Sequence, residues 1–234
     1  MNRRFALIAL PLALAALAGA TPPKKKSAPL PPPAPLGDVV RVEMVTALGP
    51  IVIDLDHKRA PVTVRNFVRY VDSRRFDGMS FYRAMHLPWG TPPNGIIQAG
   101  VRSNPKKVFA PIAHEPTSQT GILHLAGTLS MARLVPGTAM AEFSILLSDI
   151  QGFDADPKSD NPELRAGYAA FGQVISGMDV VRKIYDAPRS PTLGEGVMKG
   201  QMLAPEIRVL TVRRVPVPAP PAPPSPQPVS SPPP

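Results

Sequence analysis

Cysteine is absent from the 234 residues of the chain, and histidine occurs only four times. The lack of cysteine excludes disulfide bonds and lipid attachment at a cysteine side chain. A domain of this length can bury a core that is stable without disulfides. Because the histidines show no metal-ligand spacing such as i and i+4, we expect turn or surface roles for them, no metal and no other cofactor.

A continuous basic stripe is also missing, although the formal net charge is +9. Arg3 and Arg4 carry two of these charges and the lysines at 24–26 carry three, which leaves +4 for the rest of the chain. Nucleic-acid-binding surfaces combine clustered basic residues with interleaved aromatic residues, and the remainder has neither. We therefore expect no nucleic-acid partner.

A secretory signal peptide is predicted for residues 1–20. Two arginines precede an apolar run from Phe5 to Leu17, and the small residues Ala-Gly-Ala follow it. The run is short for a hydrocarbon core about 30 Å thick, so a membrane anchor is the less favoured alternative. We expect cleavage after Ala20, location in the periplasm and no stable membrane insertion afterwards.

Proline is abundant but concentrated near the two ends of the chain. Of the 33 prolines, seven lie in residues 21–36 and eleven in residues 216–234. Such low-complexity segments have too little apolar surface to offset the entropy cost of ordering. We expect a Pro/Lys-rich linker over 21–36, one monomeric domain over 37–215 and a disordered tail over 216–234.

The pattern of apolar residues in the domain favours strands. Residues 39–45 and 51–56 alternate apolar and polar side chains around a Gly-Pro turn, which predicts a β-hairpin with one buried face. Residues 61–71 show apolar positions at i, i+3, i+4 and i+7, which predicts a helix. Further strands are expected near Phe81 and at 96–101, 128–132, 143–147, 169–174 and 206–215, with a second helix at 178–185.

Residues 90–127 are rich in glycine, proline, asparagine and threonine and are expected to be mostly loop outside the strand at 96–101. Many short strands with two helices, in an order that does not alternate strand and helix, predict a mainly β fold. The architecture that this order favours is an antiparallel barrel with helical caps.

Six segments of this domain, taken in order, resemble the cyclophilin family of peptidyl-prolyl cis-trans isomerases. The resemblance covers nearly all of residues 39–215, and G-Y-A-A-F-G-Q-V (167–174) is similar to the exported bacterial branch. It implies an eight-stranded antiparallel β-barrel capped by two α-helices. The segments are A-P-V-T-V-R-N-F-V-R-Y-V (60–71), F-D-G-M-S-F-Y-R (76–83), I-I-Q-A-G (96–100), G-T-L-S-M-A-R (127–133), A-E-F-S-I (141–145) and F-G-Q-V-I-S-G-M-D-V-V (171–181).

The implied function is to accelerate Xaa-Pro rotation in exported proteins as they fold, with proline-containing polypeptides as substrates. Rotation is slow because it breaks amide resonance, at a cost of about 18–20 kcal/mol. Catalysis needs no nucleophile or metal. A cation that hydrogen-bonds the proline nitrogen binds the twisted amide more strongly than either planar form, which lowers the barrier.

The resemblance also assigns residues to the site. Arg83 corresponds to the catalytic arginine, and Gln98 to the glutamine that fixes the substrate backbone. Tyr168 stands where many members have histidine and exported bacterial members often have tyrosine. The other residues expected to bind substrate are Ile96, Ala132, Glu142, Phe143, Leu164 and Trp89.

Two departures from the family deplete the socket expected for the proline ring. Gly95 and Ser144 stand where aromatic residues are usual. Trp89, in an apparent insertion over 87–91, is expected to fold back and replace one of them. Glu142 replaces a common glutamine and is expected to orient Arg83.

The depleted socket leaves more than one function open. The first is the isomerase. The second is a chaperone module of the same fold that binds proline-containing peptides with little or no turnover. A scaffold of the cell envelope, which would use the two proline-rich ends, is a third and less favoured alternative.

Overall fold

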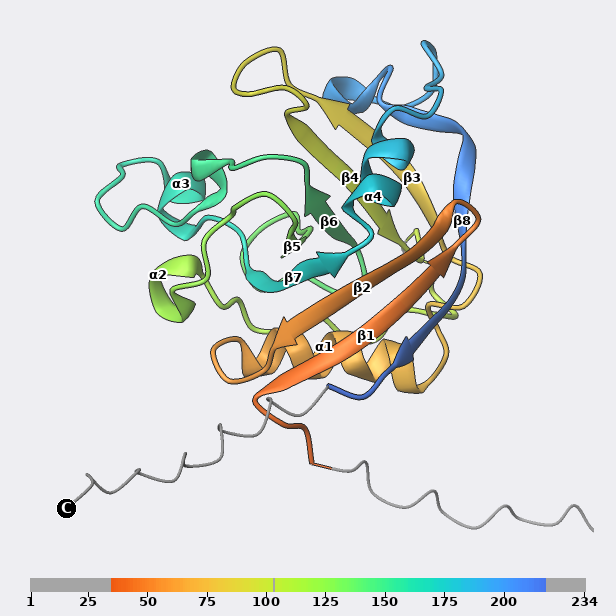
Figure 1. The fold of residues 1–234 in the computed structure, drawn as a ribbon. Helices are drawn as coiled ribbons and strands as arrows, with labels where there is room; N and C mark the ends of the chain where they lie inside the picture. Colours follow the sequence, from red (N-terminus) through yellow and green to blue (C-terminus); the bar gives the residue numbers. More distant parts are fainter. Residues whose placement is uncertain (1–34, 103, 218–234) are drawn as a thin grey trace, which may run out of the picture. The chain divides into compact units, whose positions relative to one another are not determined.

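The computed structural model describes residues 35–102 and 104–217 (Figure 1). The predicted signal peptide and most of the predicted linker and tail lie outside the described residues, so they stay predictions. Within the described residues, no helix combines the length and the apolar character needed to cross a membrane.

Eight antiparallel strands form a closed barrel, which confirms the mainly β fold (Figure 1). The order around the barrel is β1-β2-β7-β5-β6-β4-β3-β8, so the first and last strands are neighbours and close the sheet. The strands are β1 (Val39–Thr46), β2 (Gly49–Asp56), β3 (Ser80–His86), β4 (Gly95–Gly100), β5 (Thr128–Met131), β6 (Phe143–Leu146), β7 (Ala170–Ser176) and β8 (Met202–Arg214).

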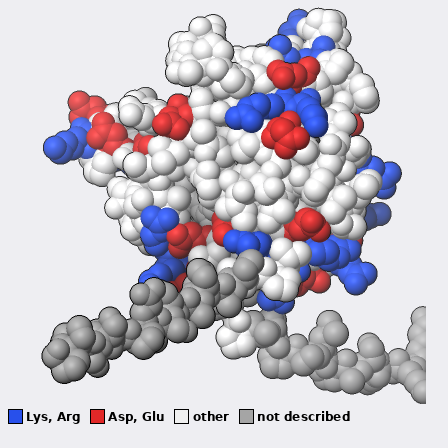
Figure 2. Space-filling model, viewed as in Figure 1, with Lys and Arg blue, Asp and Glu red and all other residues white. Residues whose placement is uncertain are grey.

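The predicted hairpin is formed by β1 and β2. Its alternating pattern turns Val42, Met44 and Ile53 into the barrel, where they are fully buried. On the outer face, Arg41 lies opposite Asp54 and donates two hydrogen bonds to its carboxylate, at 2.7 and 2.8 Å. On the face seen in Figure 2, positive and negative side chains are interspersed in the same manner.

Both predicted helices are present, and they pack at opposite ends of the barrel (Figure 1). Helix α1 (Pro61–Asp72) points Phe67 into the core, where its ring centroid lies 5.2 Å from that of Phe143. Helix α4 (Met178–Tyr185) packs against β2, β3 and β4 and buries Val181 and Ile184. The apolar stripe of each helix therefore faces the barrel, as its spacing predicts.

The structure also has elements that the sequence patterns did not predict. Two short helices, α2 (Thr117–Thr120) and α3 (Pro162–Ala166), and two 3-10 turns, η1 (Gln151–Phe153) and η2 (Gly196–Met198), lie in the connections. Helices of four or five residues are too short to show a periodic apolar stripe. Strand β8 begins at Met202, four residues earlier than expected, because Ala204 and Pro205 break the alternation that marks a strand.

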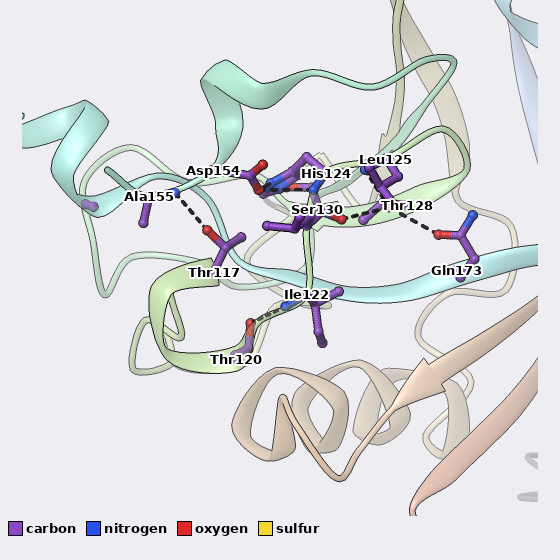
Figure 3. Close-up of polar contacts among 12 residues, drawn as sticks. Thr117, Thr120, Ile122, His124, Leu125, Thr128, Ser130, Asp154, Ala155 and Gln173 are labelled. Atoms are coloured by element: carbon purple, nitrogen blue, oxygen red, sulfur yellow. Dashed lines mark hydrogen bonds and ion pairs between the residues drawn. The ribbon is translucent and has the colours of Figure 1, made fainter. Parts of the chain in front are cut away.

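A buried histidine joins η1 to β5 (Figure 3). His124 was expected in a turn or on the surface, but only 1% of it is exposed. Its Nδ1 lies 2.7 Å from Oδ1 of Asp154, and its Nε2 lies 2.8 Å from the hydroxyl of Ser130. Because Asp154 directly follows η1, this network holds Phe153 in place relative to the barrel.

A neutral imidazole fits the network around His124. Its Nδ1–H donates to Asp154, and its Nε2 accepts from the Ser130 hydroxyl. Burial lowers the pKa of His124, and the hydrogen bond and charge of Asp154 offset only part of this effect. The folded chain therefore favours the neutral form.

Acidification is expected to destabilise the chain through His124. Its pKa in the folded state lies below the ordinary value of 6.5, so the unfolded state binds the proton more readily. The stabilisation is fully present above about pH 6.5 and is lost as the pH falls from there through the folded-state pKa. Melting temperatures measured by circular dichroism between pH 7.5 and pH 5 should therefore fall.

The variant His124→Asn isolates this effect. At pH 7.5 the free energy of unfolding of this variant should be lower than that of the unmodified chain by about 1–3 kcal/mol, because the substitution disrupts a buried hydrogen-bond network. The difference in the free energy of unfolding between the two chains should narrow toward pH 5, because the unmodified chain is destabilised by protonation of His124 and the variant has no imidazole there. His57→Asn, at a more accessible position, is the matched control. A difference that stays constant with pH would contradict the prediction.

Candidate active site

A cleft of about 680 Å³ opens over strands β3, β4, β5 and β6. Its other walls come from residues 132–142, from η1 and η2, and from the start of β8. Six of the residues that the sequence assigns to the site line this cleft: Arg83, Gln98, Ile96, Ala132, Glu142 and Tyr168.

Strand register places four polar residues in one row across the cleft. Arg83 pairs with Gln98, and Gln98 pairs with Ser144 on the next strand. Ser144 in turn pairs with Ser130. Directly paired residues point to the same face of a sheet, so all four side chains lie on the cleft side. The row runs from a cation at one end to the His124 network at the other.

A β-bulge in β3 places the side chain of Arg83 in this row. The register of β3 against β4 shifts between Phe81 and Arg83, which leaves Tyr82 as the extra residue on β3. Against β8 the register shifts at the same point, but there the extra residues lie on β8. Phe81 is buried in the core, whereas Tyr82 and Arg83 both line the cleft. A bulge re-aims side chains in this way because it interrupts the alternation of the strand.

Three contacts hold the guanidinium of Arg83. Its Nη1 donates to Oε1 of Gln98 at 2.9 Å, and its Nε donates to Oε1 of Gln201 at 2.8 Å. Its Nη2 lies 3.4 Å from the sulfur of Met85. Burial lowers the pKa of Arg83, but arginine remains charged at neutral pH. The cleft therefore contains an oriented, partly desolvated cation.

Glu142 contacts Tyr82 in the cleft. The acceptors that orient Arg83 are the two glutamines, and the carboxylate of Glu142 accepts a hydrogen bond of 2.7 Å from the hydroxyl of Tyr82. Burial, followed by the charge of Glu142, raises the pKa of Tyr82 far above its ordinary value. Tyr82 therefore stays protonated and keeps donating to Glu142.

Three residues expected to bind substrate lie away from the cleft. Phe143 is fully buried in the core, because it alternates on β6 with Ser144, which faces the cleft. Leu164 lies on α3 and is 45% exposed, and Trp89 lies between β3 and β4 and is 65% exposed. Neither lines the cleft. The expectation that Trp89 folds back over the socket is therefore wrong.

Phe153 provides the aromatic wall that was expected from other residues. It lines the cleft from η1, and its ring centroid lies 4.9 Å from that of Tyr168. Arg133 packs over the Tyr168 ring at 4.7 Å and donates a hydrogen bond of 2.6 Å to the carbonyl of Gly167. No local pattern around Phe153 marks it as a site residue, because its position depends on the buried His124 contact.

Gly95 is required by its surroundings. It lies in β4 with a positive φ of 143°, and a side chain there would collide with the backbone carbonyl of Met85. The aromatic residue expected at this position would not fit. Gly95 and Ser144 both stand where the family usually has an aromatic residue. Of these two, Ser144 lines the cleft and Gly95 does not.

Methionine forms much of the remaining lining. Its long, polarizable side chain adapts to ligands of different shape. Within the described residues, no group of three or more histidine, aspartate or glutamate side chains is arranged to hold a metal ion. The five methionines of the cleft are Met85, Met131, Met140, Met198 and Met202.

The family model for cyclophilin type peptidyl-prolyl cis-trans isomerases matches residues 41–212. A peptidyl-prolyl cis-trans isomerase of Acinetobacter baylyi is 39% identical over 153 residues, which cover 64% of this chain and 73% of that protein. Peptidyl-prolyl cis-trans isomerase A of Dickeya dadantii is 35% identical over 147 residues, which cover 61% of this chain and 70% of that protein.

A solved structure of a cyclophilin type isomerase from Cryptosporidium parvum has a TM-score of 0.58 at 19% identity and covers 77% of this chain and 99% of its own. A second structure of that protein, in the presence of the dipeptide Ala-Pro, has a TM-score of 0.57 at 19% identity and covers 76% and 99%. At this identity the two structures support the fold. The family match spans most of the barrel, and the chain therefore belongs to the cyclophilin type peptidyl-prolyl cis-trans isomerase family.

Proposed function

We propose that this chain is a peptidyl-prolyl cis-trans isomerase that lowers the barrier to Xaa-Pro rotation without forming a covalent bond. The observation that carries the proposal is Arg83, a partly buried cation held in one orientation inside an otherwise largely apolar cleft. Family membership and the names of the relatives support the same activity.

Arg83 has donors to spare for a substrate. A guanidinium carries five N–H groups, and within the described residues three of them are directed at Gln98, Gln201 and Met85. The remaining two are available to the cleft. The proline nitrogen becomes a hydrogen-bond acceptor only when the amide twists, so Arg83 binds the transition state more strongly than the planar amide.

Gln98 and Ala132 are suited to hold the substrate backbone. Oε1 of Gln98 accepts from Arg83, which leaves its Nε2 donors for a substrate carbonyl. The N–H of Ala132 already donates to the carbonyl of Glu142 at 2.9 Å. A substrate contact through Ala132 is therefore expected at its own carbonyl oxygen.

Phe153, Ile96 and Ser144 line the same cleft, and they are the residues we propose for the socket of the proline ring. The short side chain of Ser144 removes apolar surface that an aromatic residue would offer to the ring. This observation favours the second candidate, a module that binds proline-containing peptides with little turnover. The two candidates share the cleft and differ in the rate that it supports.

Exported proteins are the proposed substrates, and the periplasm is the proposed location of a monomeric enzyme of the exported bacterial branch. The predicted signal peptide and the G-Y-A-A-F-G-Q-V segment support this part of the proposal. Ala-Pro peptides are the natural first probes, since a relative has been solved in the presence of that dipeptide.

Replacing Arg83 is expected to abolish most of the catalysis. Arg83→Ala should lower kcat/KM for an Ala-Pro peptide by about 10²-fold or more, because it removes the donor to the twisted amide. Arg83→Lys should retain part of the rate, since lysine keeps the charge but lacks the planar fork. An isomer-exchange assay measures both rates.

Arg59→Ala is the matched control, because Arg59 pairs with Asp56 on the surface and does not line the cleft. Its kcat/KM should be unchanged. The proposal fails if the unmodified chain shows no acceleration or if Arg83→Ala leaves the rate unchanged. Peptide binding that persists without turnover would support the binding module instead.

Ser144→Phe is expected to raise kcat/KM. The ring would add apolar surface to the proline socket, and a partly buried aromatic side chain contributes on the order of 1 kcal/mol, or roughly fivefold in binding. The gain should appear mainly as a lower KM. Ser144→Ala, which removes the hydroxyl without filling space, should show no gain. An unchanged or higher KM in a folded Ser144→Phe chain would show that this socket does not limit the enzyme.

A further inference from the structure

Arg83 is held by a second glutamine, which neither the sequence patterns nor the family resemblance marks. Gln201 lies between η2 and β8, 118 residues along the chain from Arg83. Its Oε1 accepts from Nε of Arg83 at 2.8 Å, and its Nε2 donates to the carbonyl of Val197 at 2.7 Å. One side-chain amide therefore joins the arginine of the cleft to the η2 turn.

The backbone of Gln201 is also fixed. Its carbonyl accepts from the N–H of Ala84 at 2.9 Å, and its N–H donates to the carbonyl of Met198 at 3.1 Å. Met202, the next residue, pairs with Arg83 in the register of β3 and β8. Hydrogen bonds of the Gln201 backbone and of its Nε2 therefore fix the position of its Oε1, which accepts from Nε of Arg83.

Two acceptors on different nitrogens define the plane of a guanidinium. Without Gln201, the guanidinium of Arg83 would keep one hydrogen bond to oxygen, at Gln98, and the weaker contact with the sulfur of Met85. With Gln201 on Nε as well, the plane is fixed and the remaining N–H groups keep one direction. Burial makes the loss of either acceptor costly, because it leaves an N–H group unpaired in a partly desolvated site.

We infer that Gln201 is a positioning residue for Arg83 in the isomerase reaction, acting through the Nε hydrogen bond. This inference rests on the proposed function. Gln201 is not among the residues that line the cleft, and its side-chain amide is directed at Arg83 and at Val197. It acts on the rate of the chemical step through the orientation of the cation, and not on the affinity for the peptide.

Gln201→Met tests the inference, because methionine has a similar length but no strong acceptor. It should lower kcat for an Ala-Pro peptide by about tenfold or more, as misplaced catalytic groups do, with KM nearly unchanged. Gln201→Glu keeps an acceptor for Nε, loses the donor to Val197 and adds a negative charge beside the guanidinium. It should retain kcat within about threefold of the unmodified chain, since the orientation of Arg83 is kept.

Gln173→Met is the matched control. Gln173 also accepts and donates through its side-chain amide, from the Thr128 hydroxyl at 3.2 Å and to the carbonyl of Ala126 at 2.7 Å, but it lies outside the cleft (Figure 3). Its kcat should be unchanged. A similar fall in kcat for Gln173→Met and Gln201→Met would overturn the inference.

A double-mutant cycle separates positioning from a general effect on the fold. In the Arg83→Ala background, Gln201→Met should cause no further loss, because the group that it positions is gone. An equal loss in both backgrounds would show that Gln201 acts on the structure as a whole and would overturn the inference. An unchanged kcat for Gln201→Met in the unmodified background would overturn it too.

The NMR signal of the Arg83 Nε–H provides a readout that does not depend on turnover. It is assigned by its loss in Arg83→Ala. Its exchange with solvent should be slow in the unmodified chain and in Gln201→Glu, and fast in Gln201→Met. Unchanged exchange in Gln201→Met would overturn the inference. A chain without isomerase activity refutes the proposed function, and the exchange rates then decide the positioning contact alone.

Discussion

The pairing of β1 with β8 is the constraint on which the rest of the structure depends. It closes the sheet, so every strand has two neighbours and no strand can slip without breaking the register of the others. The row from Arg83 to Ser130 crosses four adjacent strands of this closed sheet. Its geometry therefore needs no flexible segment to hold it.

The two walls of the cleft are attached to this rigid floor in different ways. Phe153 is held by a buried histidine that bridges Asp154 and Ser130, whereas Met198 is carried by the η2 turn, to which Gln201 is tied. One wall depends on a polar network inside the protein, and the other on contacts near its surface. Each wall is therefore attached to a different end of the row, one at Ser130 and the other at Arg83.

The barrel was largely predictable from the sequence, and the site only in part. Alternation and helical spacing locate most elements because they report local burial, and the resemblance places Arg83 and Gln98 correctly in one cleft. It misplaces Leu164, because the connection after η1 is irregular and carries no periodic signal. Gln201 was missed since its partner lies 118 residues away, and no local pattern reports a contact of that range.

The late position of β8 in the chain has a consequence for when the site exists. Gln201 and Met202 come after all the other residues that line or support the cleft, and β8 lies between β1 and β3 in the barrel. A chain that emerges N-terminus first can pair β1 with β2 early, but it gives Arg83 both of its glutamines only when the last strand docks. Non-local strand pairing is a slow part of folding. A chain in which β8 has not docked therefore lacks the second acceptor of Arg83, and the site is complete only once the barrel has closed.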